Sequence, residues 1–417
     1  MGLSSTAPSI LEADLPTFSY DFAATPHDIL GDVRRAQARA PFAMGPLGPE
    51  VLSYEMARDM LRDDRFRMPP AMMLAAQGIT SGPLYDKMIN SLLGLEGPPH
   101  TRLRKLVARA FTPRATSGLT DTIHDVMNGL IDQVADVGRC DVVSDLARPY
   151  PTPIICALIG APAEDWPLFS AWTDEIFKAM NFKPDAAFDE SEVMQAWGEL
   201  DAYVDDMVAA RRNHLTDDLL SELIRAESDG DRLNLAELRM LVAGFLMAGT
   251  DTTRHQLAAS VQVLCEHPDQ WAKLSEQPEL AMQAVEESMR HSPAVCIAPR
   301  IALEDAEFGG YVFPEGTFIV VNTFAANRDP AMYGDPDRFD IARRDLPAIL
   351  TFGGGAHYCL GANLARRELA EALVVITRRL PAPHRAGPAP WKSLLGMTGP
   401  ETLPIEFQAD KLVTADA

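Results

Sequence analysis

Basic residues, cysteines and long apolar runs are all scarce in this chain of 417 residues. The 37 Lys and Arg residues stand against 59 Asp and Glu residues, so the formal net charge is −22. Neutralising nucleic-acid phosphates needs Lys and Arg surfaces, and this balance therefore argues against a nucleic-acid partner. No apolar run is long enough to span a bilayer, and the N-terminus lacks the pattern of a signal peptide. We therefore expect a cytoplasmic protein without a membrane anchor.

The cysteines are odd in number and contain no Cys-x-x-Cys pair: they are Cys140, Cys156, Cys265, Cys296 and Cys359. This spacing disfavours a disulfide framework and a thiolate zinc site, and it suits a reducing compartment. The chain can nevertheless bury a large core, because 47% of its residues are hydrophobic.

Cys359 lies in a glycine-rich stretch that runs from Phe352 to Gly361. Glycine permits positive φ and close approach of a backbone to a ligand, so we expect a shaped loop. Strong helix formers follow, which places the sulfur near a helix N-terminus, where a thiolate and hence a metal ligand is favoured. A buried structural cysteine, or a turn that happens to contain one, would not by itself explain the glycines together with Phe352 and His357.

A second unusual stretch is a helix predicted to begin after Asn234, with Glu237 as its capping partner. The helix is almost continuously apolar and is therefore expected to be buried. Within it, Gly244 and Gly249 each cost about 1 kcal/mol relative to Ala, and the polar residues 250–253 follow. Such breaks of local preference point to function. A kinked core helix, with Thr hydroxyls bonded to the preceding turn, would also explain them.

Two charged pairs occur at helical spacing. His100 and Arg104 lie four residues apart on a basic helix predicted over residues 100–111, and Glu287 and Arg290 lie three apart. Taken alone, the first pair indicates a solvated helix face, and the second an exposed ion pair contributing about 0–1 kcal/mol.

These stretches resemble the signatures of the cytochrome P-450 superfamily. The segment Phe352–Gly361 matches the haem-binding signature Phe-Gly-x-Gly-x-His-x-Cys-x-Gly at every fixed position, and Ala248–Thr253 resembles the oxygen-activation motif. The resemblance implies a mainly α fold with small β-sheets (α+β), a triangular helix-rich prism around a buried haem. It also implies one catalytic domain over residues 1–417, with an N-terminal tail of about residues 1–15 and β-rich parts near residues 41–66 and 293–325.

The resemblance also implies roles for single residues. Cys359 would be the axial ligand of the iron of haem b, Asp251 the acid and Thr252 the alcohol that supply protons during oxygen activation. The loop would be shaped by Phe352, Gly353 and Gly361, and a groove for dioxygen would be opened by Ala248 and Gly249.

Further groups would hold the haem and the surrounding structure. The propionates would be neutralised by His100, Arg104, Arg300 and His357, although His357 could also be an ordinary packed histidine. Glu287 and Arg290 would form an ion network that is completed by Arg338 from the segment before the haem loop.

An apolar substrate is expected from the residues that would line the pocket. These are Met72, Met73, Phe177, Met180, Ala243, Met247, Ala294, Val295, Ile297 and Met397. Core packing is an equally good explanation for several of them. Fatty acids, terpenoids, steroids and aromatic compounds would all suit such walls.

Electrons would come from a separate ferredoxin and an NAD(P)H-dependent reductase. A basic proximal face for the ferredoxin would consist of Arg102, Lys105, Arg109, Arg114, Arg366 and Arg367. The resulting hypothesis is a haem monooxygenase that hydroxylates a hydrophobic small molecule with dioxygen. The alternatives are a peroxide-driven enzyme and a non-catalytic member that binds a ligand or a carrier protein.

Overall fold

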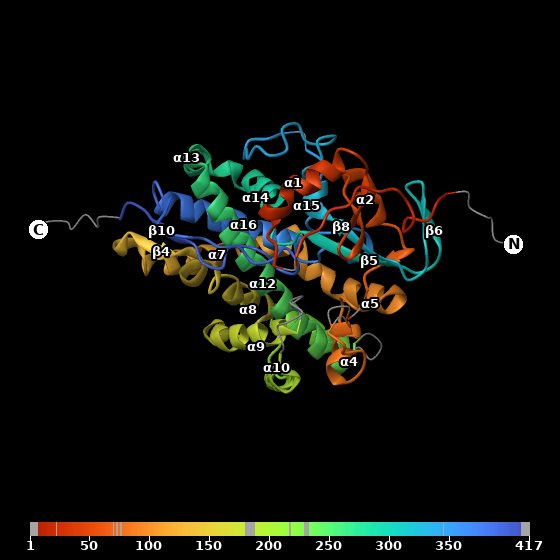
Figure 1. Ribbon diagram of the computed structural model, residues 1–417. Coiled ribbons are helices and arrows are strands. Elements are labelled where there is room, and N and C mark those ends of the chain that lie inside the picture. Colours follow the sequence, from red (N-terminus) through yellow and green to blue (C-terminus); the bar gives the residue numbers. More distant parts are fainter. Residues whose placement is uncertain are drawn as a thin grey trace, which may run out of the picture.

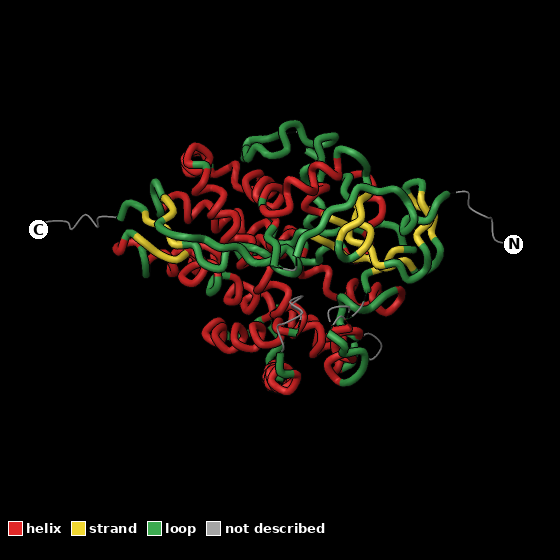
Figure 2. The backbone as a smooth tube through the Cα atoms, in the orientation of Figure 1, coloured by secondary structure: helices red, strands yellow, loops and turns green. Residues whose placement is uncertain are grey.

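The predominance of helices with small sheets that the sequence predicts is confirmed by the computed structural model (Figures 1 and 2). None of the described helices combines the length and apolar character needed to cross a bilayer. The structure describes residues 7–409, apart from Phe22, Pro70, Met72, Met73, Ala76, residues 180–187, Asp217, residues 229–232 and Asp345.

The helices share a common centre, the 32-residue helix α12. Figure 1 shows α12 crossing the middle of the molecule, with α8, α9 and α10 on one side and α14 and α16 on the other. The helices are α1 (Pro26–Gln37), α2 (Tyr54–Met60), α4 (Pro83–Ile89), α5 (Gly97–Val107), α6 (Pro113–Ser117), α7 (Thr120–Asp132), α8 (Pro151–Ile159), α9 (Trp166–Lys178), α10 (Glu190–Arg211), α11 (Leu219–Ser228), α12 (Leu235–Glu266), α13 (Pro268–Glu276), α14 (Ala281–His291), α15 (Thr323–Ala326) and α16 (Ala362–Arg379).

Helix α12 begins where its sequence predicts. Asn234 Oδ1 accepts a hydrogen bond from Glu237 N (2.9 Å), and Glu237 Oε2 accepts one from Asn234 N (3.0 Å). This capping box satisfies two of the donors that a helix start leaves free. Most of the helix after it is buried, which fixes the position of the polar residues that it carries.

The strands lie in two separated groups at opposite sides of the helices (Figure 2). Within the described residues, the larger sheet has the order β1-β2-β8-β5-β3, and smaller sheets have the orders β4-β10-β9 and β6-β7. The strands are β1 (Phe42–Gly45), β2 (Gly48–Val51), β3 (Phe66–Arg67), β4 (Arg139–Asp141), β5 (Ile297–Ala302), β6 (Ala306–Phe308), β7 (Tyr311–Phe313), β8 (Phe318–Asn322), β9 (His384–Arg385) and β10 (Pro404–Glu406).

The larger sheet contains a buried carboxyl group, that of Glu50 on β2, with 0% of its surface exposed. Its two oxygens accept hydrogen bonds from Tyr20 Oη (2.9 Å) and Asn322 Nδ2 (2.9 Å), both neutral donors. Burial raises the pKa of Glu50 to about 7, although both hydrogen bonds act to lower it. Glu50 therefore connects the N-terminal segment to the sheet, and its ionisation near neutral pH places a charge inside the protein.

We expect stability to fall as Glu50 ionises. Because its folded-state pKa lies above the ordinary value of 4.5, the loss develops as pH rises from about 4.5 to about 7. Glu50→Gln removes this titration. The difference in the free energy of unfolding between the variant and the wild type should therefore shift in favour of the variant by up to about 3 kcal/mol from pH 5 to pH 8. Urea unfolding at both pH values measures the difference. The exposed Glu55→Gln is the control, and an equal pH dependence of wild type and Glu50→Gln would contradict the assignment.

Candidate active site

The loop before Cys359 has a fixed shape that depends on its glycines. Gly353 and Gly355 have φ values of 71° and 65°, which other residues rarely adopt. A Cβ on Gly355 would lie 2.5 Å from the carbonyl oxygen of Leu61, so the loop also packs too closely against the end of α2 for a side chain. Cys359 N donates to Phe352 O (2.9 Å), which closes the loop just before α16.

Cys359 is an exposed residue whose thiol lies near Gly361, Arg104 and Arg366. Burial raises the pKa of this thiol, while the Gly361 N–H and the guanidinium groups of Arg104 and Arg366 act in the opposite direction. The predicted preference for a thiolate is thus not the net result for the protein alone. The three groups nevertheless stabilise negative charge on the sulfur, as a metal-bound thiolate requires.

Arginine and histidine side chains gather beside this loop. The rings of His100 and His357 contact each other at a tilt of 39°, with their centroids 4.4 Å apart, and His357 Nε2 lies 3.0 Å from Glu96 Oε1. Arg104 donates to the carbonyl oxygen of Tyr358, next to the cysteine. Arg300 on β5 is buried, and this burial lowers its pKa to about 10. Glu96 also acts on the pKa of Arg300, so the structure brings all four predicted propionate-binding residues to one region.

These donors fit a ligand that carries carboxylates. His100 Nε2 is buried and has no hydrogen-bond partner among the described residues. Neither Arg104 nor Arg300 has a carboxylate within ion-pair distance in the described part of the chain, and Arg300 donates to Pro299 O (2.8 Å). Buried polar groups normally have partners, so a cluster of this kind calls for one. The two propionates of a haem would supply it, with Cys359 as the protein ligand of the iron.

Three successive residues of α12 point in three directions. The Asp251 carboxyl contacts Arg254, the Thr252 hydroxyl donates to Ala248 O (3.0 Å), and Thr253 forms a hydrogen bond with Glu368 of α16. Successive residues of a helix are turned by about 100°, so the three side chains can serve three different surroundings. The backbone bond of Thr252 is the one expected for a core threonine, and it does not prevent the hydroxyl from accepting a further bond.

A partly exposed stripe in the middle of α12 consists of the half-buried Gly244 and Thr252 and the exposed Ala248, four residues apart. No atom lies within 4 Å of a Cβ placed on Gly244, so the helix borders open space there. Gly249 has a different reason to be small, because a Cβ on it would lie 3.0 Å from Ile155 Cδ1 of α8. Helix packing thus accounts for Gly249, whereas Ala248 and Gly244 border the space beside Thr252.

Asp251 belongs to a chain of ion pairs. Arg254 contacts Asp251 and also places Nη1 2.8 Å from Asp174 Oδ1. Asp174 in turn contacts Arg148. Asp251 is buried, with 5% of its surface exposed, whereas Arg148 reaches solvent, so the chain of pairs connects the buried acid to the surface.

A second route of polar contacts reaches the same residue. His255 Nδ1 donates to Asp251 O (2.8 Å), and His255 Nε2 accepts from Lys392 Nζ (2.8 Å). Burial lowers the pKa of His255 to about 4, which agrees with a neutral ring that accepts from lysine. Arg148, Asp174, Arg254, His255 and Lys392 line a cleft of about 240 Å³. The sequence did not single out Arg254, His255 or Lys392.

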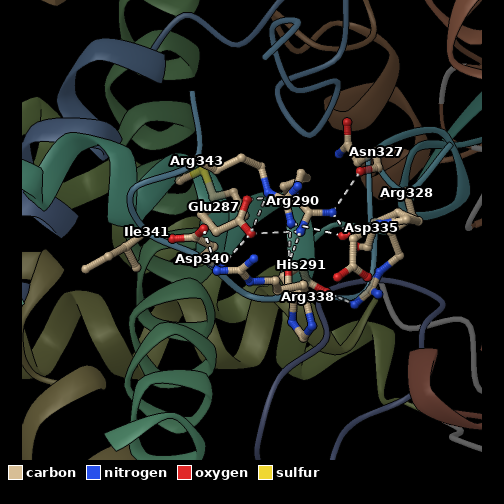
Figure 3. A network of polar contacts seen from close by, with 12 residues as sticks. Glu287, Arg290, His291, Asn327, Arg328, Asp335, Arg338, Asp340, Ile341 and Arg343 are labelled. Carbon is tan, nitrogen blue, oxygen red and sulfur yellow. Dashed lines mark hydrogen bonds and ion pairs between the residues drawn. The ribbon is translucent and has the colours of Figure 1, made fainter. Parts of the chain in front are cut away.

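The predicted ion pair between Glu287 and Arg290 is present and buried (Figure 3). Arg290 donates Nε to Glu287 Oε2 (2.7 Å) and Nη2 to Glu287 Oε1 (2.9 Å), and Nη1 donates to Pro336 O (2.7 Å). Both side chains are almost fully buried, at 0% and 2% exposure. The pair therefore fastens α14 to the loop that precedes the cysteine.

The prediction that Arg338 completes this network is wrong. Arg343 does so, with Nε 3.3 Å from Glu287 Oε1, whereas the Arg338 side chain is 63% exposed and pairs with Asp340 (3.2 Å). Arg338 contributes its carbonyl oxygen, which accepts from Arg290 Nη2 (3.1 Å) and Arg343 Nη2 (2.7 Å). The side chain beside Glu287 in Figure 3 is thus that of Arg343, five residues further along the loop.

The predicted substrate walls divide into several groups. Ala243 and Met247 are buried in the main core, and Phe177 packs against that core, as the core-packing explanation expects. Ala294 and Ile297 are also buried. Three further predicted wall residues, Met72, Met73 and Met180, lie outside the described residues.

The C-terminal turn lies against the segment before β5. Thr398 N donates to Ala294 O (2.9 Å), and both Val295 and Met397 are half-buried there. This turn is therefore adjacent to the segment that carries Ala294 and Val295. Whether these residues contact a substrate stays a prediction.

The basic residues of the predicted partner face differ in how they are engaged. Arg102, Arg366 and Arg367 contact Glu237, Glu286 and Glu371, respectively. Lys105, Arg109 and Arg114 are exposed on α5, η1 (Ala108–Phe111) and α6. A cleft of about 220 Å³ next to the cysteine loop adds Arg58 and Arg62, which the sequence did not single out.

Comparison with known proteins gives consistent matches. The family model for Cytochrome P450 matches residues 83–381. The chain is 38% identical to luteothin monooxygenase of Streptomyces thioluteus over 94% of this chain and 95% of the relative. It is 35% identical to cytochrome P450 monooxygenase PikC of Streptomyces venezuelae, over 91% and 89% of the two chains.

Solved structures agree with this match. The crystal structure of CalO2 superposes with a TM-score of 0.85 at 29% identity, over 93% of this chain and 100% of that chain. Epothilone D-bound cytochrome P450epoK gives a TM-score of 0.85 at 28% identity, over 94% and 99% of the two chains.

Proposed function

The chain belongs to the cytochrome P450 family and is a cytochrome P450 monooxygenase, and we propose that it hydroxylates a hydrophobic small molecule with dioxygen. The family implies a haem-thiolate cofactor, which we take to be haem b. The relatives' names give several substrates, including luteothin, nocardicin C, mycinamicin IV and vitamin D(3), so similarity alone does not select one. We take the whole chain to form one catalytic domain.

The observation that carries the proposal is the cluster beside Cys359 of two arginines, Arg104 and Arg300, without a carboxylate partner among the described residues, together with the unpartnered Nε2 of His100. Cys359 would hold the haem iron, and His100, Arg104, Arg300 and His357 would hold the propionates. When bound, a thiolate-ligated haem supplies the electron density that favours O–O cleavage. The Gly361 N–H forms a hydrogen bond to the sulfur, which would orient it and adjust the reduction potential of the iron.

The residues of α12 would supply the protons. Thr252 lies on the partly exposed stripe with Ala248 and Gly244, where its hydroxyl can hold a proton donor in place. Asp251 faces away from this stripe toward Arg254 and His255. The ion pairs of Arg254 with Asp251 and Asp174 give a buried carboxylate a connection to the surface cleft, through which protons can be replaced.

Asp251→Asn is expected to lower kcat by about 100-fold or more, because general acid groups typically contribute 10²–10⁴-fold. Substrate affinity should change little, since the amide keeps the shape of the carboxyl. Turnover under saturating substrate and the substrate-induced spectral shift measure the two effects. Asp174→Asn, which removes the other carboxylate on Arg254, is the matched control and should lower kcat much less. An equal loss in both variants would assign the effect to Arg254.

A separate ferredoxin would deliver electrons at the cysteine side. Lys105, Arg109 and Arg114 are exposed, and Arg58 and Arg62 border the cysteine loop. In a chain with net charge −22, this local excess of positive charge would steer an acidic partner, in a manner that salt weakens.

The proposed reaction is tested with the purified protein, ferredoxin, ferredoxin reductase and NAD(P)H. A panel of apolar compounds is first screened for the haem spin shift that substrates induce. Compounds that bind should then yield a hydroxylated product that carries one atom from labelled dioxygen. Product formation from hydrogen peroxide, with none from the electron-transfer chain, would overturn the proposal in favour of a peroxide-driven enzyme.

A further inference from the structure

The carboxyl group of Glu368 lies where α12 and α16 cross. Its partner there is Thr253, which follows the proposed catalytic pair Asp251 and Thr252 directly in the chain. Glu368 and Thr253 have 2% and 4% of their surfaces exposed. The bond between them therefore connects two helices inside the protein, away from solvent.

Glu368 has no cation in reach among the described residues. The two arginines that precede it on α16 point elsewhere, because Arg366 contacts Glu286 and Arg367 contacts Glu371. Burial raises the pKa of Glu368 well above its ordinary value, and the hydrogen bond from Thr253 opposes this only in part. An unpaired buried carboxylate is costly, so burial favours the neutral form of this group.

The surroundings of Glu368 hold it in one position. The hydroxyl of Tyr150, which has 0% of its surface exposed, donates to the Glu368 carbonyl oxygen (2.7 Å). A third helix region thus fixes the turn of α16 that carries Glu368. Because the position of the Glu368 backbone is fixed, its carboxyl group can determine the orientation of the Thr253 hydroxyl.

The two connected helices carry the two halves of the proposed active site. Helix α16 begins three residues after Cys359, and α12 carries Asp251 and Thr252. A rotation of α12 that broke the Thr253–Glu368 bond would also turn Thr252, together with Ala248 and Gly244, out of its present orientation. The bond therefore determines how Thr252 is oriented relative to Cys359.

We propose that Glu368 is a positioning residue, an uncharged carboxyl that holds Thr253 and thereby keeps Thr252 oriented for proton delivery. The inference rests on the proposed function for its consequence in catalysis. The neutral state and the contact with Thr253 are properties of the protein itself, and they can be tested without turnover.

Infrared spectroscopy tests the neutral state. Difference spectra between wild type and Glu368→Gln at pH 8 should show the loss of one C=O stretching band of a protonated carboxyl group. Glu371→Gln, one turn further along α16, is the matched control and should keep this band. Thr253→Val should keep the band and shift its frequency, because the hydroxyl partner is gone. Absence of the band in wild type, or its loss in the Glu371 variant, overturns the inference.

Coupling of NAD(P)H oxidation to product formation tests the positioning role. Glu368→Gln keeps a neutral hydrogen-bonding group and should retain the wild-type ratio of product to NAD(P)H. Glu368→Leu and Thr253→Val should each lower this ratio several-fold and release hydrogen peroxide, and the double variant should be no worse than either.

Three results would contradict positioning. A ratio in Glu368→Gln as low as in Glu368→Leu would show that the carboxyl proton itself is consumed. An unchanged ratio in Thr253→Val, or strictly additive losses in the double variant, would show that the contact does not orient Thr252. If no variant and no wild type forms product, the proposed function fails, and the infrared result still decides the state of Glu368.

Discussion

Replacing Cys359 with alanine is expected to abolish the red-shifted Soret band of the reduced, carbon monoxide-bound protein. A Cys359 thiolate bound to the haem iron would give this band, and no other cysteine lies in a loop of this shape in the described structure. The Gly361 N–H, Arg104 and Arg366 all favour a negative charge on the Cys359 sulfur. In the alanine variant there is no sulfur to carry this charge. Product formation with ferredoxin and reductase should fall below detection.

The matched control is Cys156→Ala, which removes a buried thiol from α8. Burial raises the pKa of that thiol to about 12, so it is no thiolate and should not contribute to the band. Haem content is measured alongside, because the propionate-binding residues remain in the Cys359 variant. Survival of the band in Cys359→Ala would assign the ligand elsewhere and remove the basis of the proposed function.

Replacing Arg290 with alanine is expected to destabilise the protein by about 3–5 kcal/mol, because Arg343 is then the one cation left beside the buried Glu287 carboxylate among the described residues. Arg290 makes two hydrogen bonds to Glu287 and two more to carbonyl oxygens of the loop before Cys359, those of Pro336 and Arg338. The loop that positions the cysteine should therefore loosen as well. We expect a lower urea midpoint and most haem lost during purification.

Arg338→Ala separates this effect from a general effect of charge. Its side chain is exposed and pairs with Asp340, so its removal should change stability by about 0–1 kcal/mol. Arg343→Ala should lie between the two variants, since its contact with Glu287 is longer and partly accessible. Equal losses of stability in the Arg338 and Arg343 variants would indicate that the Arg338 side chain does take part in the Glu287–Arg290 network.

Local features of the site could be predicted from the sequence because their causes are local. The positive φ values of Gly353 and Gly355 follow from glycine, and the start of α12 follows from Asn234 and Glu237. Helical spacing also placed Glu287 beside Arg290. The same spacing could have found Arg254, three residues after Asp251, had the charged neighbours of the motif been considered.

Other features depend on how distant segments meet, and the sequence holds no direct signal for them. Arg338 and Arg343 lie on one irregular loop, where no repeat tells which of them turns inward. Gly249 owes its size to Ile155 of another helix, and Glu96 meets His357 across the cysteine loop. Glu368 lies within a helix of ordinary composition, and its isolation from cations becomes visible only when α12 and α16 cross.

The three directions taken by Asp251, Thr252 and Thr253 limit how the length of α12 can change. One residue inserted or deleted before them would rotate the whole group by about 100° and send each side chain to another's surroundings. Arg254, the partner of Asp251, would leave Asp174, and Thr253 would leave Glu368, in a single event. Substitutions can alter the three contacts one at a time, whereas a change of length alters all of them together. The register of α12 is therefore expected to tolerate point changes far better than insertions or deletions.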